Sequence, residues 1–355
     1  VDLSQTAGWE FINALLDSEP NDLDESFRRA MFQITGGHPL FAVEQFRSMQ
    51  ESGGLVRDGA GRWAAGEILD WESIPARVDA VIAERLARLS AECRLILEAA
   101  SVQGEIFSAE TLAVVLGKRE PQIIERLSGE LCQQHQLVYA ESLQRFGETT
   151  SSHYRFRHAL YQRQLYRNLD PVRSARLHQA TAQVMERSCP LGATGKSSIE
   201  DDPARLAFHF DKAGLVEKAI HYHKIAGEQA YRLAANQDAS FHFNRALELL
   251  KSMPESSDRI QGELLLLISL SSAMNAVRGY AEPKLRQLFE RIGELASKSG
   301  GTELVAQALY LRGSYHYARA EYQQTLDAGT RLMELYCQDS TPWISDMANF
   351  LIGVS

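Results

Sequence analysis

The residues from Pro190 to Ser197, PLGATGKS, nearly match the spacing of a phosphate-binding P-loop. In that motif, glycines at both ends let successive backbone N–H groups curl around a phosphate. Here Pro190 stands at the first glycine position, and proline has no backbone N–H and a fixed φ. The residues before it have a helical pattern, and no aliphatic run ending in an acid follows to hold magnesium. We therefore interpret this stretch, Lys196 included, as a loop between helices.

The histidines do not have the spacing of a metal site or of a catalytic set. His221 and His223 are two positions apart on a predicted helix, so their side chains point to different sides. The residue order gives no Ser-His-Asp or Cys-His arrangement, and the acidic residues have the pattern of solvated helix faces. The other histidines considered are His153, His158, His178 and His209. We expect no catalytic residue, no bound metal and no enzymatic activity in this chain.

The composition indicates a folded protein with more than one domain. The chain has 355 residues, of which 45% are hydrophobic, so it can bury real cores. Its formal net charge of -9 disfavours a general nucleic-acid or membrane-surface coat. The four cysteines have neither metal-ligand spacing nor an obvious disulfide framework, and they are Cys93, Cys132, Cys189 and Cys337. A reduced, cytoplasmic compartment fits this pattern best.

The ends of the chain and its apolar runs bear on the kind of protein expected. The longest apolar run, Leu264 to Leu270, is far too short to span a membrane, and no secretory signal opens the chain. The chain does not begin with Met, and it stops at Ser355 inside a predicted helix. We therefore expect a fragment of a longer protein.

The first 73 residues predict helices that meet at a tight corner. Two apolar stripes within residues 9–34 indicate two helices, and Gly36 and Gly37 should end the second. Pro39 can then occupy the first turn of a third helix. Residues 51–72 predict a polar, glycine-rich connection, with Trp63 and Trp71 holding it onto a core.

Residues 74–157 have the element order of a winged helix. A long helix begins near Ile74, Ser90 and Ser108 fit N-caps of two further helices, and another helix begins at Pro121. Two strand-like runs follow, residues 137–140 and 154–156. This order suggests DNA binding, but the candidate recognition helix, residues 119–136, carries two Arg and three Glu. Its net charge of -1 favours a packing or regulatory role.

Residues Tyr154 to His178 form the predicted boundary between the first part of the chain and a region that is helical throughout. The pattern changes there from strand alternation to helical spacing. From Pro203 onward, helices are predicted at residues 203–213, 215–234, 236–252, 257–277, 282–298, 303–319, 321–336 and from 342. Gly313 and Tyr317 lie where a tetratricopeptide repeat (TPR) has small and aromatic residues. We expect stacked, TPR-like helix pairs, with a plain helical bundle as the alternative.

Several stretches together resemble the C-terminal part of STAND-class signalling ATPases, the group that includes NB-ARC switches and MalT-like regulators. The matching runs include TGGHPLF, IPARVDAVIAERLARL, AASVQGEIF, YRFRHALYQRQLY and ARLAFHFDKAGLVEKAIHYHKIAGEQA. Similar large bacterial AAA-ATPase/TPR proteins often carry an adenylate cyclase or a winged-helix transcription regulator domain at the N-terminus. The resemblance implies a lid, a winged helix and a helical sensor.

The resemblance also implies two nucleotide contacts in an intact parent protein. Pro39 in GGHPL matches a lid motif whose proline lies near adenine, and His158 in FRHAL corresponds to a histidine that contacts phosphate. His158 is alternatively only the cap of the helix it begins. The nucleotide-binding core of the family, with its P-loop and magnesium-binding acid, is missing from this sequence. ATP or ADP with Mg is therefore implied for the parent, and no cofactor for this chain.

The combined prediction is a mostly α-helical regulatory and interaction module. Residues 1–73 would be the end of an ATPase core and lid, 74–157 a winged helix, 158–202 linking helices and 203–355 TPR-like repeats. The concave face of the repeats would bind a protein, a peptide or a small inducer, with no nucleic acid and no membrane as direct partner. The alternatives are a winged-helix DNA-binding transcription regulator and an ATPase in its own right that uses Lys196.

Overall fold

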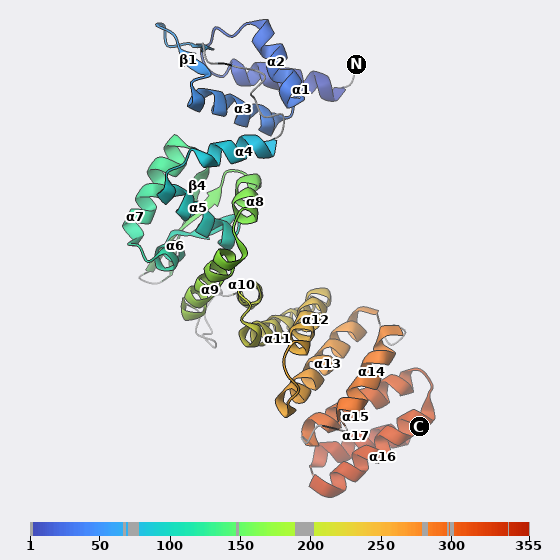
Figure 1. Ribbon diagram of the computed structural model, residues 1–355. Helices are drawn as coiled ribbons and strands as arrows, with labels where there is room; N and C mark the ends of the chain where they lie inside the picture. Colours follow the sequence, from blue (N-terminus) through green and yellow to red (C-terminus); the bar gives the residue numbers. More distant parts are fainter. Residues whose placement is uncertain are drawn as a thin grey trace. The chain divides into compact units, whose positions relative to one another are not determined.

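The computed structural model describes residues 3–66, 69, 78–146, 149–188, 202–278, 283–296, 298, 302–339 and 341–354 (Figure 1). The chain divides into two compact units, residues 1–173 and 174–355. Helices make up most of both units, and the strands within the described residues all lie in the first. The prediction of a mostly α-helical protein with a winged helix followed by helical repeats is confirmed.

The first unit begins with helices and a short hairpin. These elements are α1 (Leu3–Leu16), α2 (Glu25–Thr35), α3 (Pro39–Ser52), β1 (Leu55–Arg57) and β2 (Trp63–Ala65). As predicted, a glycine ends α2, with Gly36 at a φ of 59°, and Pro39 occupies the first turn of α3. The hairpin corrects the expectation of a plain connection over residues 51–72. Its turn forms because Asp58 accepts hydrogen bonds from the backbone N–H groups of Ala60 and Arg62.

Trp63 attaches this hairpin to the helices, as the sequence predicted. Its indole packs against a core that contains Ile12, Met31 and Phe46, and its Nε1 donates to Glu19 Oε2 at 2.8 Å. Trp63 is half-buried, and an indole N–H turned away from water in this way needs such an acceptor. Trp71, the other tryptophan expected in this role, lies outside the described residues.

The next part of the first unit has winged-helix topology. Its elements are α4 (Val78–Ala87), α5 (Ala91–Gln103), β3 (Ile106–Ser108), α6 (Ala109–Leu116), α7 (Glu120–Glu125), the π-helix η1 (Arg126–Gln134), β4 (Val138–Phe146) and β5 (Thr149–Phe156). The strands form an antiparallel sheet in the order β3-β5-β4. Both predicted caps are present: Ser90 Oγ accepts from the N–H of Cys93, and Ser108 Oγ accepts from the N–H of Thr111.

Three details of this part differ from the sequence prediction. Strand β3 was missed because its three residues are too few to show an alternating pattern. The hairpin of β4 and β5 is longer than predicted, since a bulge between Ala140 and Ser142 interrupts the alternation and the outer residues are polar. The helix expected over residues 119–136 is α7, which passes directly into the π-helical η1.

Two helices follow the sheet. Helix α8 (Ala159–Arg167) packs against α4 and α5 within the first unit, and α9 (Pro171–Ser188) comes next in the chain. The buried side of α8 is formed by Tyr161 and Leu165, which are four positions apart and therefore lie on one face of the helix. The near P-loop, residues 190–197, lies outside the described residues.

The second unit is a succession of helices, each packed on the next. They are α10 (Pro203–Lys212), α11 (Val216–Arg232), α12 (Asn236–Lys251), α13 (Ser257–Arg278), α14 (Pro283–Ala296), α15 (Thr302–Ala318), α16 (Tyr322–Asp339) and α17 (Pro342–Val354). The helices α11, α13, α15 and α17 also contact one another in turn. This stacking of one pair on the next is the arrangement expected of TPR-like repeats.

Small residues allow the close approach of α11 and α12. A Cβ atom on Gly227 would lie 2.5 Å from the ring of Phe243, so only glycine fits there. Ala239, Phe243 and Ala246 are all buried in the core of the second unit. The spacing of small and aromatic residues in this pair therefore matches the physical requirement of a TPR pair.

Helix α13 corrects one expectation about apolar segments. Over Ser257–Val277 it is long and apolar enough to cross a membrane, although the sequence prediction found no such run. Its leucines Leu264, Leu266 and Leu270 are buried in the core shared with α12 and α14. The core helix of a helical stack passes the same test of length and composition, and these contacts are those of a core helix.

Candidate functional site

The candidate site of the first unit is a buried ion cluster centred on Arg85 of α4. The side chain of Arg85 is 1% exposed. Its Nη1 donates to Glu44 Oε2 at 2.6 Å and to the Tyr161 hydroxyl at 2.7 Å, and its Nε donates to Glu51 Oε1 at 3.2 Å. Its Nη2 donates to the backbone carbonyl of His135. The planar guanidinium thus binds α3, α8 and the residue that follows η1 at the same time.

Opposite charges face one another in this cluster. Glu44 is 2% exposed, and its other oxygen lies 3.8 Å from Arg47 Nη1. Arg88 Nη1 lies 3.9 Å from Glu51 Oε2, so three arginines face the two carboxylates. Burial opposes the charged form of Arg85, but the neighbouring oxygens of Tyr161, Glu44 and Glu51 outweigh it and raise the pKa of Arg85. Burial also raises the pKa of Tyr161, so its hydroxyl stays neutral. Arg85 is therefore charged and Tyr161 neutral at ordinary pH values.

Such a cluster acts as a geometric lock. Desolvating these charges is costly, and the cost is recovered only when every partner is in place. A shift of α3 relative to α4 or α8 would leave buried charges without partners. The cluster therefore favours one arrangement of α3, α4 and α8.

The two predicted site residues lie at the starts of two helices that the cluster joins. Pro39 is in the first turn of α3, which supplies Glu44 and Glu51. His158 is the N-cap of α8, which supplies Tyr161. Arg85 thus connects the helix that Pro39 begins to the helix that His158 caps.

The imidazole of His158 is a helix cap and still keeps one nitrogen for another partner. Its Nδ1 accepts a hydrogen bond from the N–H of Leu160 at 3.1 Å, which is the capping role weighed from the sequence. An accepting Nδ1 places the proton of the neutral ring on Nε2. The side chain is exposed, so an Nε2–H group is available to donate to an anion such as a phosphate. Capping and a phosphate contact are therefore compatible.

Local sequence patterns do not mark the Arg85 cluster as a site. Arg85 shares a helix face with the apolar Val81 and Ile82, Tyr161 recurs at helical spacing with Leu165, and neither pattern connects the two. A charged residue at a buried helical position was the available signal, because such a residue requires a partner. The partners are 34 to 76 residues away in the sequence, which no local pattern relates.

Arg126 of the candidate recognition helix and Lys118, just before it, are paired with acidic side chains. Lys118 forms an ion pair with Glu92, and Arg126 Nη2 lies 3.0 Å from the same Glu92. Arg126 Nη1 also lies 3.2 Å from Glu130. Basic groups neutralised within the protein contribute little attraction for DNA phosphates.

The histidines of the second unit form buried pairs. His178 Nδ1 lies 2.8 Å from His209 Nδ1, and His223 Nδ1 lies 2.9 Å from His242 Nδ1. Burial, with Lys212 nearby, lowers the pKa of His178 to about 4, and burial, with His178 nearby, lowers the pKa of His209 to about 3. The residues that the structure describes contain no group of three or more His, Cys, Asp or Glu that could hold a metal ion.

Comparison with known proteins gives a distant relative and a weak structural likeness. No protein-family model matches the chain. An uncharacterised protein of Rhizobium meliloti (strain 1021) is 25% identical over 271 residues, which are 75% of this chain and 24% of that protein. The chain thus spans about a quarter of the length of this relative.

The solved structure is that of a STAND protein with a tetratricopeptide repeat sensor from Pyrococcus horikoshii. The two are 13% identical, and the match covers 98% of this chain and 50% of that one with a TM-score of 0.38. The chain is structurally similar to this protein at that level, and no role of an individual residue follows from the similarity.

Proposed function

We propose that this chain is the non-catalytic regulatory portion of a nucleotide-switched signal-transduction ATPase of the STAND class. In this proposal, residues 1–73 contribute a lid to an ATPase core encoded upstream, and the helical repeats bind a protein, a peptide or a small inducer. Binding to the repeats biases the nucleotide switch because one switch state binds the partner more tightly than the other. The upstream core holds ATP or ADP with Mg, and this chain adds only lid contacts.

The observation that carries the proposal is the Arg85 cluster. A nucleotide switch needs an element with two discrete arrangements. A buried ion cluster favours discrete arrangements, because any partial displacement of its helices leaves buried charges without partners. Here the cluster joins the helices that begin at Pro39 and at His158, the two residues that match the family's nucleotide contacts. Pro39 would pack against adenine, and the Nε2–H of His158 would donate to a phosphate oxygen.

DNA binding by the winged helix is the rival proposal. The pairing of Lys118 and Arg126 with Glu92 argues against it, because those cations are already neutralised. A gel-shift assay of the 355-residue chain with duplex DNA at 50 and 200 mM salt tests this rival. Salt-dependent binding would favour a DNA-binding transcription regulator over a regulatory module of an ATPase.

The nucleotide contact is tested in the full-length gene product with the fluorescent ADP analogue mant-ADP. His158→Asn keeps an N-cap acceptor and removes the imidazole donor, so we expect the analogue to dissociate about tenfold faster or more. Pro39→Ala should also accelerate dissociation. Arg163→Ala on the exposed side of α8 is the matched control and should leave the rate unchanged.

The same assay separates the two roles of His158. If His158→Asn retains the parental rate and only His158→Ala changes it, the residue is a cap and not a nucleotide contact. If the full-length product binds no adenine nucleotide at all, the switch proposal as a whole is wrong.

A further inference from the structure

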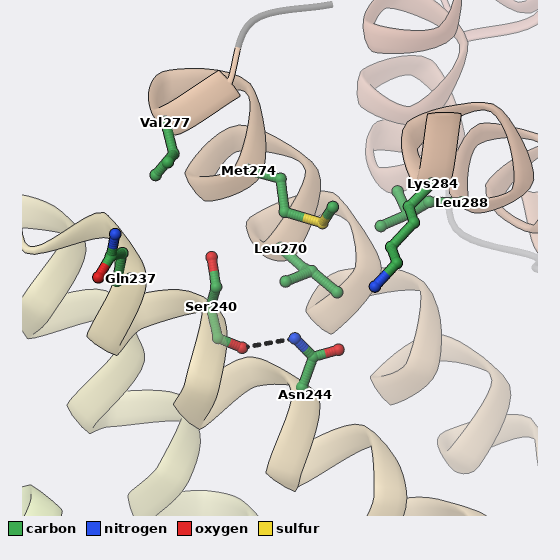
Figure 2. Close-up of a pocket in the computed structure, with 8 residues that line it drawn as sticks. All are labelled: Gln237, Ser240, Asn244, Leu270, Met274, Val277, Lys284 and Leu288. Atoms are coloured by element: carbon green, nitrogen blue, oxygen red, sulfur yellow. Dashed lines mark hydrogen bonds between the residues drawn. The ribbon is translucent and has the colours of Figure 1, made fainter. Parts of the chain in front are cut away.

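A pocket of about 540 Å³ lies between α12, α13 and α14 of the second unit (Figure 2). Helix α13 packs against both α12 and α14, so its side chains lie between the two walls that those helices provide. The volume falls within the range of sites that take a small organic molecule.

The pocket combines an apolar surface with a polar wall. Leu270 and Met274 of α13 and Leu288 of α14 supply the apolar surface, and Leu270 and Leu288 are 4% and 9% exposed. Ser240 and Asn244 of α12 form the opposite wall, where Asn244 Nδ2 donates to the backbone carbonyl of Ser240 at 2.7 Å. The flexible thioether of Met274 can adapt to the shape of an apolar ligand.

Among the described residues that line the pocket, Lys284 is the one that carries a charge. No acidic side chain is among the residues that line the pocket, and Lys284 forms no ion pair with any residue the structure describes. In Figure 2 its ammonium group points across the pocket toward the wall of α12. Lys284 also follows Pro283 in the first turn of α14, where the helix dipole favours an anion and disfavours an uncompensated cation.

We propose that this pocket binds a small amphipathic monocarboxylate, with its apolar body on Leu270, Met274 and Leu288 and its carboxylate on Lys284. A single lysine matches one negative charge, whereas a phosphate dianion would remain only half compensated. The apolar surface favours a ligand with a hydrocarbon body over a free inorganic anion. The side-chain amide of Gln237 belongs to the same wall and can donate to a polar group of the ligand. Ser240 Oγ donates to the backbone carbonyl of Asn236 at 2.8 Å, so it can serve the ligand only as an acceptor.

This inference deepens the proposed sensor role by naming the chemical class of its inducer. Only the claim that the ligand is an inducer rests on the proposed function. Binding of the ligand is measured directly on this chain and does not depend on that function. The probes are octanoate and naphthalene-1-acetate, each compared by titration calorimetry with its primary amide. We expect at least one carboxylate to bind with a stoichiometry of one and at least about tenfold more tightly than its amide.

Variants locate the binding. Lys284→Met should weaken carboxylate binding by about tenfold or more and leave amide binding unchanged. Lys251→Met, an exposed lysine of α12 outside the pocket, is the matched control and should bind as the parent does. Ser240→Trp should fill the pocket and abolish binding of both probe types.

The outcomes are decisive in both directions. Failure of both carboxylates to bind, or binding that Lys284→Met leaves unchanged, overturns the inference. Binding that has no effect on mant-ADP release by the full-length product would leave the pocket standing and contradict the sensor role. If Pro39 and His158 control nucleotide release but no carboxylate binds, the proposed switch is supported and the carboxylate pocket is wrong.

Discussion

The first unit buries a charge, Arg85, among carboxylates and a phenol, whereas the second unit buries imidazoles against each other. Arg85 is 1% exposed and has four hydrogen-bonding partners from three parts of the unit. His178 and His209 are 0% and 2% exposed, and each has the other as a hydrogen-bonded neighbour. Both arrangements give buried polar groups hydrogen-bond partners, but they differ in their response to helix displacement and to a change of pH.

The difference lies in which disturbance each arrangement resists. The guanidinium of Arg85 remains charged at any pH that the protein survives, so its cluster is sensitive to geometry and to loss of a partner. A neutral imidazole pair instead needs one donor and one acceptor nitrogen and is sensitive to protonation. The first arrangement suits a mechanical lock, and the second suits a scaffold that is rigid near neutral pH.

The largest expected effect is that of Arg85→Met. Removing the guanidinium leaves Glu44 buried without its main partner, and we expect the first unit to lose about 3–5 kcal/mol of unfolding free energy. The second unit should be unaffected. Hydrogen exchange measured by mass spectrometry reports the two units separately in the same sample.

A matched control for this variant is Arg29→Met on α2 of the same unit. Arg29 Nη2 lies 2.5 Å from Glu25 Oε1, and both side chains are exposed, so the loss should stay below about 1 kcal/mol. Adding Glu44→Leu to Arg85→Met should recover part of the lost stability, because it removes the unpaired charge. If Arg85→Met and Arg29→Met destabilise the first unit equally, burial does not distinguish the cluster from a surface ion pair.

The next effect is a pH dependence confined to the second unit. The pKa values of His178 and His209 in the folded state, about 4 and about 3, lie below the unfolded value of 6.5. Between the folded and unfolded pKa values the unfolded chain binds more protons than the folded one. The contribution of these two histidines to the unfolding free energy is therefore constant above pH ~6.5 and falls as the pH is lowered toward the folded-state values. Hydrogen exchange at pH 7.0 and 5.5 should show the second unit weakening more than the first.

Two variants check the assignment of this pH dependence. His209→Gln should reduce the slope of stability against pH in the second unit, because it removes one of the groups that must stay neutral. His221→Gln removes an exposed histidine of α11 and is the matched control for the loss of an imidazole. A parental slope in His209→Gln would exclude the His178–His209 pair as its source.

Local signals in the sequence were sufficient for most of the helices. Ser90, Ser108 and Pro39 each begin a helix where their chemistry predicted, and the helices after Pro203 match their predicted ranges closely. These features depend on neighbouring residues, which the sequence displays directly. The strand β3 was missed because three residues carry no period, and it forms only by pairing with β5.

Pro39 and His158 stay predictions, which the sequence allowed because each lies in a short motif. The clusters that depend on tertiary packing could not be predicted. The Arg85 cluster depends on residues from α3, α4 and α8, whose proximity is a result of tertiary packing. The carboxylate pocket likewise combines side chains of α12, α13 and α14, and no spacing in the sequence relates Ser240 to Lys284.

The smallest expected effect comes from the second unit's own arginine–carboxylate pair. Arg245 donates from Nε and Nη2 to Asp211 at 2.7 and 3.0 Å, which is the chemistry of Arg85 and Glu44 without the burial. Arg245 is 39% exposed, so water and salt screen the pair. We expect Arg245→Met to cost the second unit about 0.5–1 kcal/mol at low salt, and less at 0.5 M salt. Urea unfolding at both salt concentrations measures this. A loss as large as that of Arg85→Met would mean that the ion pair itself, and not its burial, sets the difference between the two units.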